Sequence, residues 1–239
     1  VTTAAIQASR DGFNLYPPDR GIPELRQAVA DHQARFYDQH VDPDDVVVAT
    51  GASEALGATV MALVEPGQEV IVFEPYFDLY AAVIELAGGV RRAVTLRTPD
   101  YSFDPAELAA AIKPSTRMIM ANTPHNPTGK VCSQAELGEI ARLAIAHDLV
   151  VVTDEVYEHM TYDGARHIPL ATLPGMAERT ITIGGLSKTY SVTGWRLASA
   201  VAPPDVSEGV RKMHDFLTVG APHPLQLAGV SALELPDSY

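Results

Sequence analysis

Lys188 and Arg196 are the residues whose types and spacing point most directly to chemistry. Lys188 follows an apolar run, Ile181 to Leu186, that ends near a pair of glycines. A lysine amine condenses with an aldehyde only when it is deprotonated, which requires a partly desolvated or electropositive pocket. Arg196 offers a planar fork that can bind a phosphate through two hydrogen bonds. The pair indicates a site for an aldehyde that carries a phosphate, and the alternative is a strand, a glycine turn and two surface cations.

The other three lysines lie in polar or helical surroundings typical of a solvated surface: Lys113, Lys130 and Lys212. Four further apolar runs rich in β-branched residues predict strands, beginning at Val46, Val70, Arg117 and Leu149. Open α/β sheets bind ligands at the carboxyl ends of their strands. We therefore expect the residues that follow these strands to converge on one crevice.

The first strand leads into Gly51, Ala52 and Ser53, and then into a helix through Leu63. Free backbone N–H groups at the start of a helix suit a phosphate. The alternative is simple helix capping by Ser53, with Glu54 in the first turn.

The next two strands end in residues that suit a planar ring. Phe77 belongs to a pair of adjacent aromatics and could lie flat on such a ring, although aromatics at a strand end also serve as core. The strand after it runs into a loop with two prolines and a glycine. We expect a cis bond at Asn126–Pro127, which would aim the Asn126 amide inward.

Asp154 ends the last of these runs, so it should be at least partly buried, and a buried carboxylate needs a charged partner. A protonated ring nitrogen would serve, and such an acid is a requirement of pyridoxal phosphate chemistry.

Five segments, in order along the chain, resemble the class I/II aminotransferases, which belong to the aspartate-aminotransferase superfamily of pyridoxal-phosphate enzymes known as fold type I. The matching segments are Asn14–Pro18 with Tyr16, Gly51–Ser53, Asn126–Gly129, Asp154–Tyr157, and Ser187–Lys188 with Thr193–Arg196.

The resemblance implies a role for each residue. Lys188 would form the Schiff base and then move the proton between the substrate Cα and the cofactor, and Asp154 would keep the pyridine nitrogen protonated. Asn126 and Tyr157 would bind the ring oxygen, and Phe77 would stack on the ring. The phosphate would be held by Gly51, Ala52, Ser53, Ser187, Arg196 and, in a homodimer with shared sites, by Tyr16 reaching a neighbouring subunit.

The expected fold class is α/β, a mostly parallel sheet flanked by helices, as in the large domain of fold type I enzymes. Residues 1–20 would form an arm that contacts the partner subunit, and residues 21–239 the cofactor-binding large domain, incomplete at its C-terminus. By resemblance the small C-terminal domain is absent, with the arginine that grips the substrate carboxylate. Helices are predicted over Pro23–Tyr37, Asp104–Ile112, Asp205–Leu217 and Ala228–Leu233, and from a capping box at Ser133 to His147.

Composition agrees with this class and excludes others. The 239 residues are 46% hydrophobic, enough for a large core. Thirty acids against 17 bases give a net charge of −13 without a basic run, which argues against nucleic acid or an anionic membrane as partner. We find no secretory leader and no run of spanning length, and the single cysteine rules out an intrachain disulfide, so a cytoplasmic location fits best.

Several residues are given structural roles. His159 and His167 match no metal motif and are predicted to be solvated, and no metal is expected. His125 could touch substrate or make a loop hydrogen bond. Glu155 is predicted to be structural. Trp195 is expected in the core, and Cys132, without a visible base, to be inert.

The sequence predicts an aminotransferase that moves an amino group between an L-amino acid and a 2-oxo acid. Two alternatives remain. One is a pyridoxal-phosphate β-lyase or specialised biosynthetic enzyme, because the same lysine and aspartate would serve it. The other is a non-enzymatic cofactor-binding regulatory domain of the kind fused to DNA-binding modules.

Overall fold

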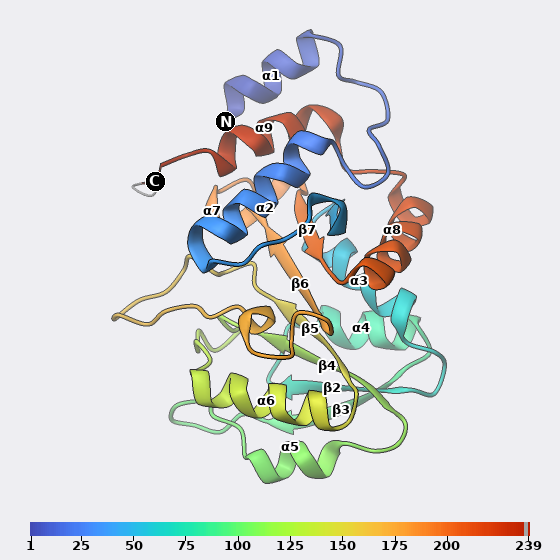
Figure 1. Ribbon diagram of the computed structural model, residues 1–239, viewed down its shortest axis with the longest axis vertical. Helices are drawn as coiled ribbons and strands as arrows, with labels where there is room; N and C mark the ends of the chain where they lie inside the picture. Colours follow the sequence, from blue (N-terminus) through green and yellow to red (C-terminus); the bar gives the residue numbers. More distant parts are fainter. Residues whose placement is uncertain (237–238) are drawn as a thin grey trace. The chain divides into compact units, whose positions relative to one another are not determined.

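The computed structural model describes residues 1–236 and 239 and divides into two compact units (Figure 1). Unit 1 comprises residues 1–58 and 183–239, and unit 2 comprises residues 59–182. Among the residues described, seven strands belong to a mostly parallel sheet flanked by helices, so the expected α/β class is confirmed. In this part of the chain, no helix is long and apolar enough to cross a membrane.

Unit 2 is built from parallel strands with helices in the connections between them. Its elements are β2 (Glu69–Glu74), α4 (Leu79–Leu86), β3 (Val90–Thr95), α5 (Pro105–Ala111), β4 (Thr116–Asn122), α6 (Gln134–Ala146), β5 (Val150–Asp154) and the 3₁₀ turn η2 (Leu170–Thr172). The strands lie in the order β3-β2-β4-β5, and each neighbouring pair is parallel. Parallel neighbours need a crossover connection, which the helices provide.

The central strands of unit 2 are buried along nearly their whole length, which explains why they read as continuous apolar runs. Ile71, Ile119 and Val151 are fully buried in this core. In the paired register of β4 and β5, Asn122 lies beside Asp154. The carboxyl ends of these two strands therefore place two polar side chains next to each other.

Strand β3 at the edge of unit 2 has a different character. Only Val94 of its six residues is buried, and Arg91 and Arg92 are exposed on it. Charged residues on an edge strand prevent pairing with another chain. This polarity also explains why the apolar-run criterion does not detect the strand.

The α6 capping box is confirmed. The Ser133 hydroxyl accepts a hydrogen bond from the Glu136 amide at 3.3 Å, and the Glu136 carboxylate accepts one from the Ser133 amide at 2.9 Å. The two groups satisfy two amides that a helix start otherwise leaves unpaired. On the face behind this cap, Leu137 and Ile140 pack into the core of unit 2.

Unit 1 contains two antiparallel strands and several helices. Its elements are α1 (Thr2–Arg10), α2 (Pro23–Tyr37), η1 (Pro43–Asp45), β1 (Val46–Ala49), α7 (Leu186–Thr189), η3 (Thr193–Trp195), β7 (Ala198–Val201), α8 (Pro204–Thr218) and α9 (His223–Leu233). Helix α3 (Ala52–Leu63) and strand β6 (Thr180–Gly185) continue from one unit into the other. Strand β7 pairs with β1, and α9 lies against both α1 and α2 (Figure 1).

A buried glutamine joins the start of α2 to α9. The Gln226 carbonyl oxygen accepts a hydrogen bond from the Ile22 amide, and its amide group donates to Ala221 O, both at 2.8 Å. Satisfying both ends of a buried amide is what makes its burial tolerable.

The predicted bounds of α2 agree with the structure at both ends.

The prediction that Trp195 packs in the core is wrong. Trp195 lies in η3, is only half-buried, and precedes Arg196, whose backbone is left-handed with φ of 54°. None of the three residues of η3 is buried.

Candidate active site

The turn after β1 brings a backbone segment and an arginine together within unit 1. Gly51 has a φ of +82°, a conformation that favours glycine. A Cβ atom at this position would lie against the Arg196 guanidinium, 2.7 Å from its Cζ. The guanidinium therefore occupies space that any larger residue at position 51 would fill.

The first turn of α3 presents backbone donors beside that guanidinium. The amides of Glu54 and Ala55 donate to Gly51 O, each at 3.1 Å. Within the described residues, the amides of Ala52 and Ser53 have no acceptor, as the first amides of a helix commonly do not. Two free amides and a guanidinium form a donor set that suits a phosphate.

Lys188 lies on α7, a four-residue helix that follows β6 directly. Lys188 is half-buried, whereas its neighbours Leu186 and Ser187 are buried. The Leu186 amide donates to Leu197 O at 3.3 Å, which joins the start of this helix to the residue before β7. The lysine is thus carried by a short element fixed at its N-terminal end.

In unit 2, Asp154 is a buried carboxylate at the end of β5, only 5% exposed. Its Oδ2 accepts a hydrogen bond from the Tyr80 hydroxyl at 2.7 Å, and its Oδ1 accepts one from the Val156 amide at 3.4 Å. Burial, and next the charge of Asp154, raise the pKa of Tyr80 well above its usual range, so Tyr80 stays a donor. A carboxylate held this way suits a cationic ring nitrogen.

Asn126 is positioned through the strand beside Asp154. The backbone amide of Asn126 donates to Asn122 Oδ1 at 2.6 Å. The side-chain amide of Asn122 in turn donates to the backbone oxygen of Asp154 at 2.7 Å. The expected cis bond at Asn126–Pro127 is present, and Thr123–Pro124 is also cis. Asn122 therefore connects the two predicted site residues of this region.

His125 agrees with the loop interpretation. It is buried, and its Nδ1 lies 2.7 Å from the Thr128 hydroxyl within the same loop. Burial lowers the pKa of His125 to about 4, so the ring is neutral at physiological pH.

The two remaining predicted site residues of unit 2 are aromatic, and each follows a strand. Phe77, after β2, is 36% exposed and meets the Tyr80 ring edge-to-face, with centroids 5.9 Å apart. Tyr157, after β5, is half-buried. Unit 2 thus carries Phe77, Asn126, Asp154 and Tyr157, and unit 1 carries the lysine and the phosphate donor set.

Sequence reasoning missed Tyr80 and Asn122, both of which hold Asp154. Each had a weak signal. Tyr80 lies in the first turn of the helix that follows Phe77, close in sequence to a predicted site residue. Asn122 ends its strand as Asp154 ends the neighbouring one.

The prediction of a solvated His167 is wrong. Its side chain is 1% exposed, and its Nε2 lies 2.8 Å from the Glu155 carboxylate, which is 2% exposed. Burial lowers the pKa of His167, but the charge of Glu155 and the hydrogen bond to it outweigh burial, so the pKa is raised. Glu155 is therefore part of a buried pair, in line with a structural role.

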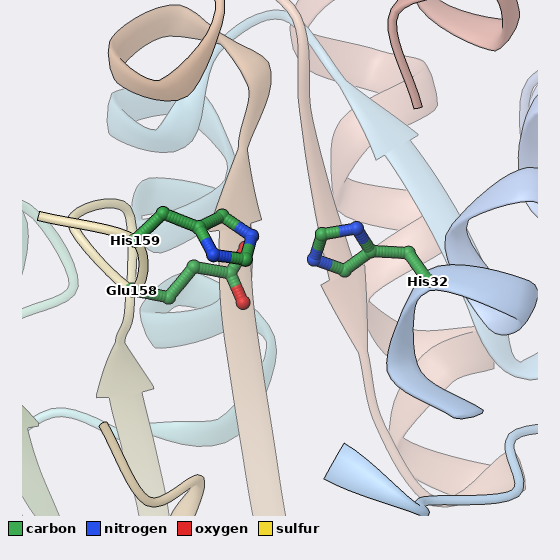
Figure 2. Close-up of side chains that lie close together, drawn as sticks. All are labelled: His32, Glu158 and His159. Carbon is green, nitrogen blue, oxygen red and sulfur yellow. The ribbon is translucent and has the colours of Figure 1, made fainter. Parts of the chain in front are cut away.

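His159, by contrast, is exposed. Figure 2 shows it beside Glu158 on the segment after β5, with His159 Nε2 4.0 Å from Glu158 Oε1. A structural metal site takes about four ligands, and this pair of unit 2 supplies two. His32, also drawn there, belongs to α2 of unit 1.

Two other expectations concern the loop after β4. Lys130 is not solvated: its side chain is 12% exposed and its Nζ lies 2.9 Å from Glu136 Oε1. Burial raises the pKa of Cys132 to about 11, so the thiol stays protonated, in line with the expectation of an unreactive cysteine.

Tyr16 is 81% exposed, and so is Leu15. The backbone next to it is anchored within unit 1, because the His223 imidazole donates from Nδ1 to Leu15 O at 3.2 Å. Phe13 contacts the same imidazole edge-to-face at 5.3 Å. A tethered segment thus presents a tyrosine that its own unit does not cover.

The α/β sheet and the order of these residues along the chain are those of the fold type I pyridoxal-phosphate proteins. The chain belongs to the aminotransferase class I and II family, whose model matches residues 1–239. Aminotransferases of this class depend on pyridoxal phosphate.

Individual proteins similar to this chain are also named aminotransferases. A probable N-succinyldiaminopimelate aminotransferase of Mycobacterium tuberculosis is 44% identical over 99% of this chain and 60% of its own. A methionine aminotransferase of Escherichia coli is 38% identical over 95% of this chain and 61% of its own. The chain spans about 60% of the length of these curated relatives.

Solved structures are similar too. The N-succinyldiaminopimelate aminotransferase of M. tuberculosis superposes with a TM-score of 0.97 at 44% identity, over 99% of this chain and 62% of that one. An aromatic aminotransferase of Pyrococcus horikoshii superposes with a TM-score of 0.96 at 36% identity, over 99% of this chain and 64% of that one.

Proposed function

We propose that this protein is a pyridoxal-phosphate aminotransferase that transfers an amino group between an L-amino acid and a 2-oxo acid. The observation that carries the proposal is the buried Asp154, held by Tyr80 and Val156 at the end of β5. A carboxylate buried in this way is suited to pairing with a cation, and the protonated pyridine nitrogen of the cofactor would be such a cation. The similarity to named aminotransferases over almost the whole chain supports the same reaction.

The residues of each unit fit the cofactor. In unit 1, Ala52, Ser53 and Arg196 supply donors for a phosphate, and Gly51 leaves the space that the guanidinium needs. Gly51 and Ser187 belong to the same predicted phosphate site. When bound, the cofactor supplies an aldehyde for the amino group and a ring that accepts electrons from the substrate Cα.

The protein's own groups then have distinct tasks. The Lys188 amine would hold the aldehyde and, once released from it, would take the proton from the substrate Cα and deliver it to the C4′ carbon of the cofactor. Asp154 keeps the ring nitrogen protonated. Asn126 and Tyr157 bind the ring oxygen, and Phe77 covers one face of the ring.

The proposed assembly is a homodimer in which Tyr16 reaches the phosphate of the other subunit. Its 81% exposure and the anchored backbone beside it support this assignment, because a tyrosine packed in its own subunit would be covered. A two-fold dimer is the commonest closed assembly, and its interface lets each subunit complete the other's site. The arm of residues 1–20 and the cofactor-binding domain of residues 21–239 are part of the same proposal, as is a cytoplasmic location.

The amino donor is best sought among the substrates named by the relatives. These are N-succinyldiaminopimelate, methionine and kynurenine, the last with 2-oxoglutarate as acceptor. A panel of these donors with 2-oxoglutarate, followed by amino-acid analysis, identifies the preferred one. Elimination products instead of a new amino acid would favour the β-lyase alternative, and no turnover of any donor would favour the regulatory one.

Lys188 provides the direct test. Reduction of the full-length holoprotein with borohydride, followed by peptide mapping, should leave the pyridoxyl group on Lys188, because Lys188 is the lysine carried by the short helix directly after β6. A label on Lys113, Lys130 or Lys212 would refute the assignment.

A further inference from the structure

A buried glutamate–histidine pair is built into the turn that we assign to the phosphate. Glu54, the residue after Ser53, has a side chain 12% exposed, and His214 on α8 is 0% exposed. His214 Nδ1 lies 2.9 Å from Glu54 Oε2. The same Oε2 accepts the Thr50 amide at 2.9 Å. The carboxylate is therefore clamped between the end of β1 and α8.

The chemistry of the two side chains decides which of them donates the hydrogen bond between Glu54 and His214. An ionised carboxylate only accepts, so His214 Nδ1 carries the hydrogen that it gives to Glu54. The Thr218 hydroxyl, 3.2 Å from the same nitrogen, then donates to His214 O at 3.3 Å instead. Among the described residues, Glu54 Oε1 and His214 Nε2 are buried without a partner.

A buried pair of this kind contributes little to the stability of the fold beyond what apolar residues would. Removing two polar groups from water is expensive, and apolar residues of similar volume often serve as well. Here two of the four polar atoms remain unpaired, which adds to the expense. The pair must therefore be explained by what its position does.

Its position is inside an anion-binding turn. Glu54 stands in the first turn of α3, beside the free amides of Ala52 and Ser53. A carboxylate at a helix start competes for those amides and repels a bound phosphate. Two donors, the Thr50 amide and the His214 imidazole, instead hold it on the side of the turn that faces α8.

We propose that His214 is a positioning residue for the phosphate site: by binding Glu54 it keeps the carboxylate away from the α3 amides and offsets its charge. The inference rests on the proposed phosphate role of Gly51–Ser53 and Arg196. His214 itself touches neither cofactor nor substrate. Its effect is confined to ligands that carry a phosphate.

The test compares the dissociation constants of the full-length apoprotein for pyridoxal phosphate and for pyridoxal, which lacks the phosphate. The dissociation constant for pyridoxal divided by that for pyridoxal phosphate is the ratio that measures phosphate selectivity. His214→Leu removes the donor at similar volume and should lower the ratio about tenfold, the size expected for one lost charge-assisted hydrogen bond. His214→Gln keeps a hydrogen-bond donor and should restore part of the lost phosphate selectivity. Glu54→Gln/His214→Leu should return the ratio to near the wild-type value, because no charge remains to offset.

Three variants make the outcomes distinguishable. His167→Leu makes the same change at the buried pair of unit 2 and should leave the ratio unchanged. Arg196→Gln should lower it strongly, and if it does not, the proposed phosphate site itself fails. If Arg196→Gln lowers the ratio but His214→Leu weakens both ligands equally, or the double variant is as poor as His214→Leu, the inference is wrong. If His214→Leu does not fold, Glu54→Gln alone decides: a ratio equal to or above wild type supports the proposal, and a tenfold fall overturns it.

Discussion

The two units hold their parts of the proposed site by opposite means. Unit 1 offers backbone amides and a guanidinium, a donor set for an anion, whereas unit 2 offers the buried carboxylate of Asp154, an acceptor for a cation. Yet both carry a glutamate directly after a predicted site residue. Glu54 follows Ser53 and Glu155 follows Asp154, and each is paired with a buried histidine at 2.9 and 2.8 Å.

The difference lies in what else the glutamates bind. Glu54 also accepts the Thr50 amide, so its pair is joined to the phosphate turn. Among the described residues the Glu155 side chain has one hydrogen-bond partner, His167, while Asp154 beside it is held separately by Tyr80 and Val156. The same pair of side chains can therefore tune a ligand in one unit and stabilise a segment in the other. Three substitutions sharpen or break this comparison.

The largest effect is expected from Asp154→Asn, which should slow amine transfer by roughly a thousandfold or more, as losses of a central electrostatic group do. A neutral amide cannot keep the ring nitrogen protonated, although it can still accept from Tyr80. Stopped-flow half-reactions measure the rate, and circular dichroism checks the fold. Tyr80→Phe, which removes only one donor, should slow the reaction less; wild-type rates in Asp154→Asn would contradict the assigned role.

His167→Leu should come next, lowering the free energy of unfolding by about 3 kcal/mol below pH 6, because it leaves Glu155 buried and unpaired. The pKa of His167 is raised in the folded state from its ordinary 6.5. The pair's stabilisation is therefore complete below pH 6.5 and is lost as pH rises through the raised value.

Urea unfolding of wild type and His167→Leu across pH 5.5–9.5 measures this. The gap between the two proteins should narrow as the pH rises. A gap that is constant or widens with pH would show that His167 is not the titrating partner of Glu155.

Tyr16→Phe should have the smallest effect, weakening cofactor binding by about 1.5–3 kcal/mol through the loss of one hydrogen bond to a charged acceptor. Leu15→Ala, an equally exposed neighbour, is the matched control and should leave cofactor affinity unchanged. Equilibrium dialysis of the full-length protein gives both values. An active monomer, or unchanged affinity in Tyr16→Phe, would favour a tyrosine with no role across the interface.

Local patterns predicted the elements that carry their own signals. The bounds of α2 and the capping box of α6 follow from Pro23 and from Ser133 with Glu136, because helix ends are decided by neighbouring residues. The polar edge strand β3 and the short β7 have no such signal, since their pairing partners rather than their own sequences define them.

The candidate site divides in the same way. Gly51, Asp154 and Lys188 stand after apolar runs and were visible from sequence alone. Tyr80 and His214 were not, because each meets its partner, Asp154 or Glu54, far along the chain. His167 was misjudged because it follows a turn at Tyr162–Gly164, and only the folded chain places it against Glu155.

The absent side chain of Gly51 has a consequence for anyone who redesigns this protein. The volume that a methyl group would take at position 51 is already held by the guanidinium of Arg196. The residue type that position 51 can accept therefore depends on the side chain at position 196. A library that varies position 51 while keeping Arg196 samples mostly steric conflicts, and with a smaller residue at 196 the φ of +82° would still strain any side chain at 51.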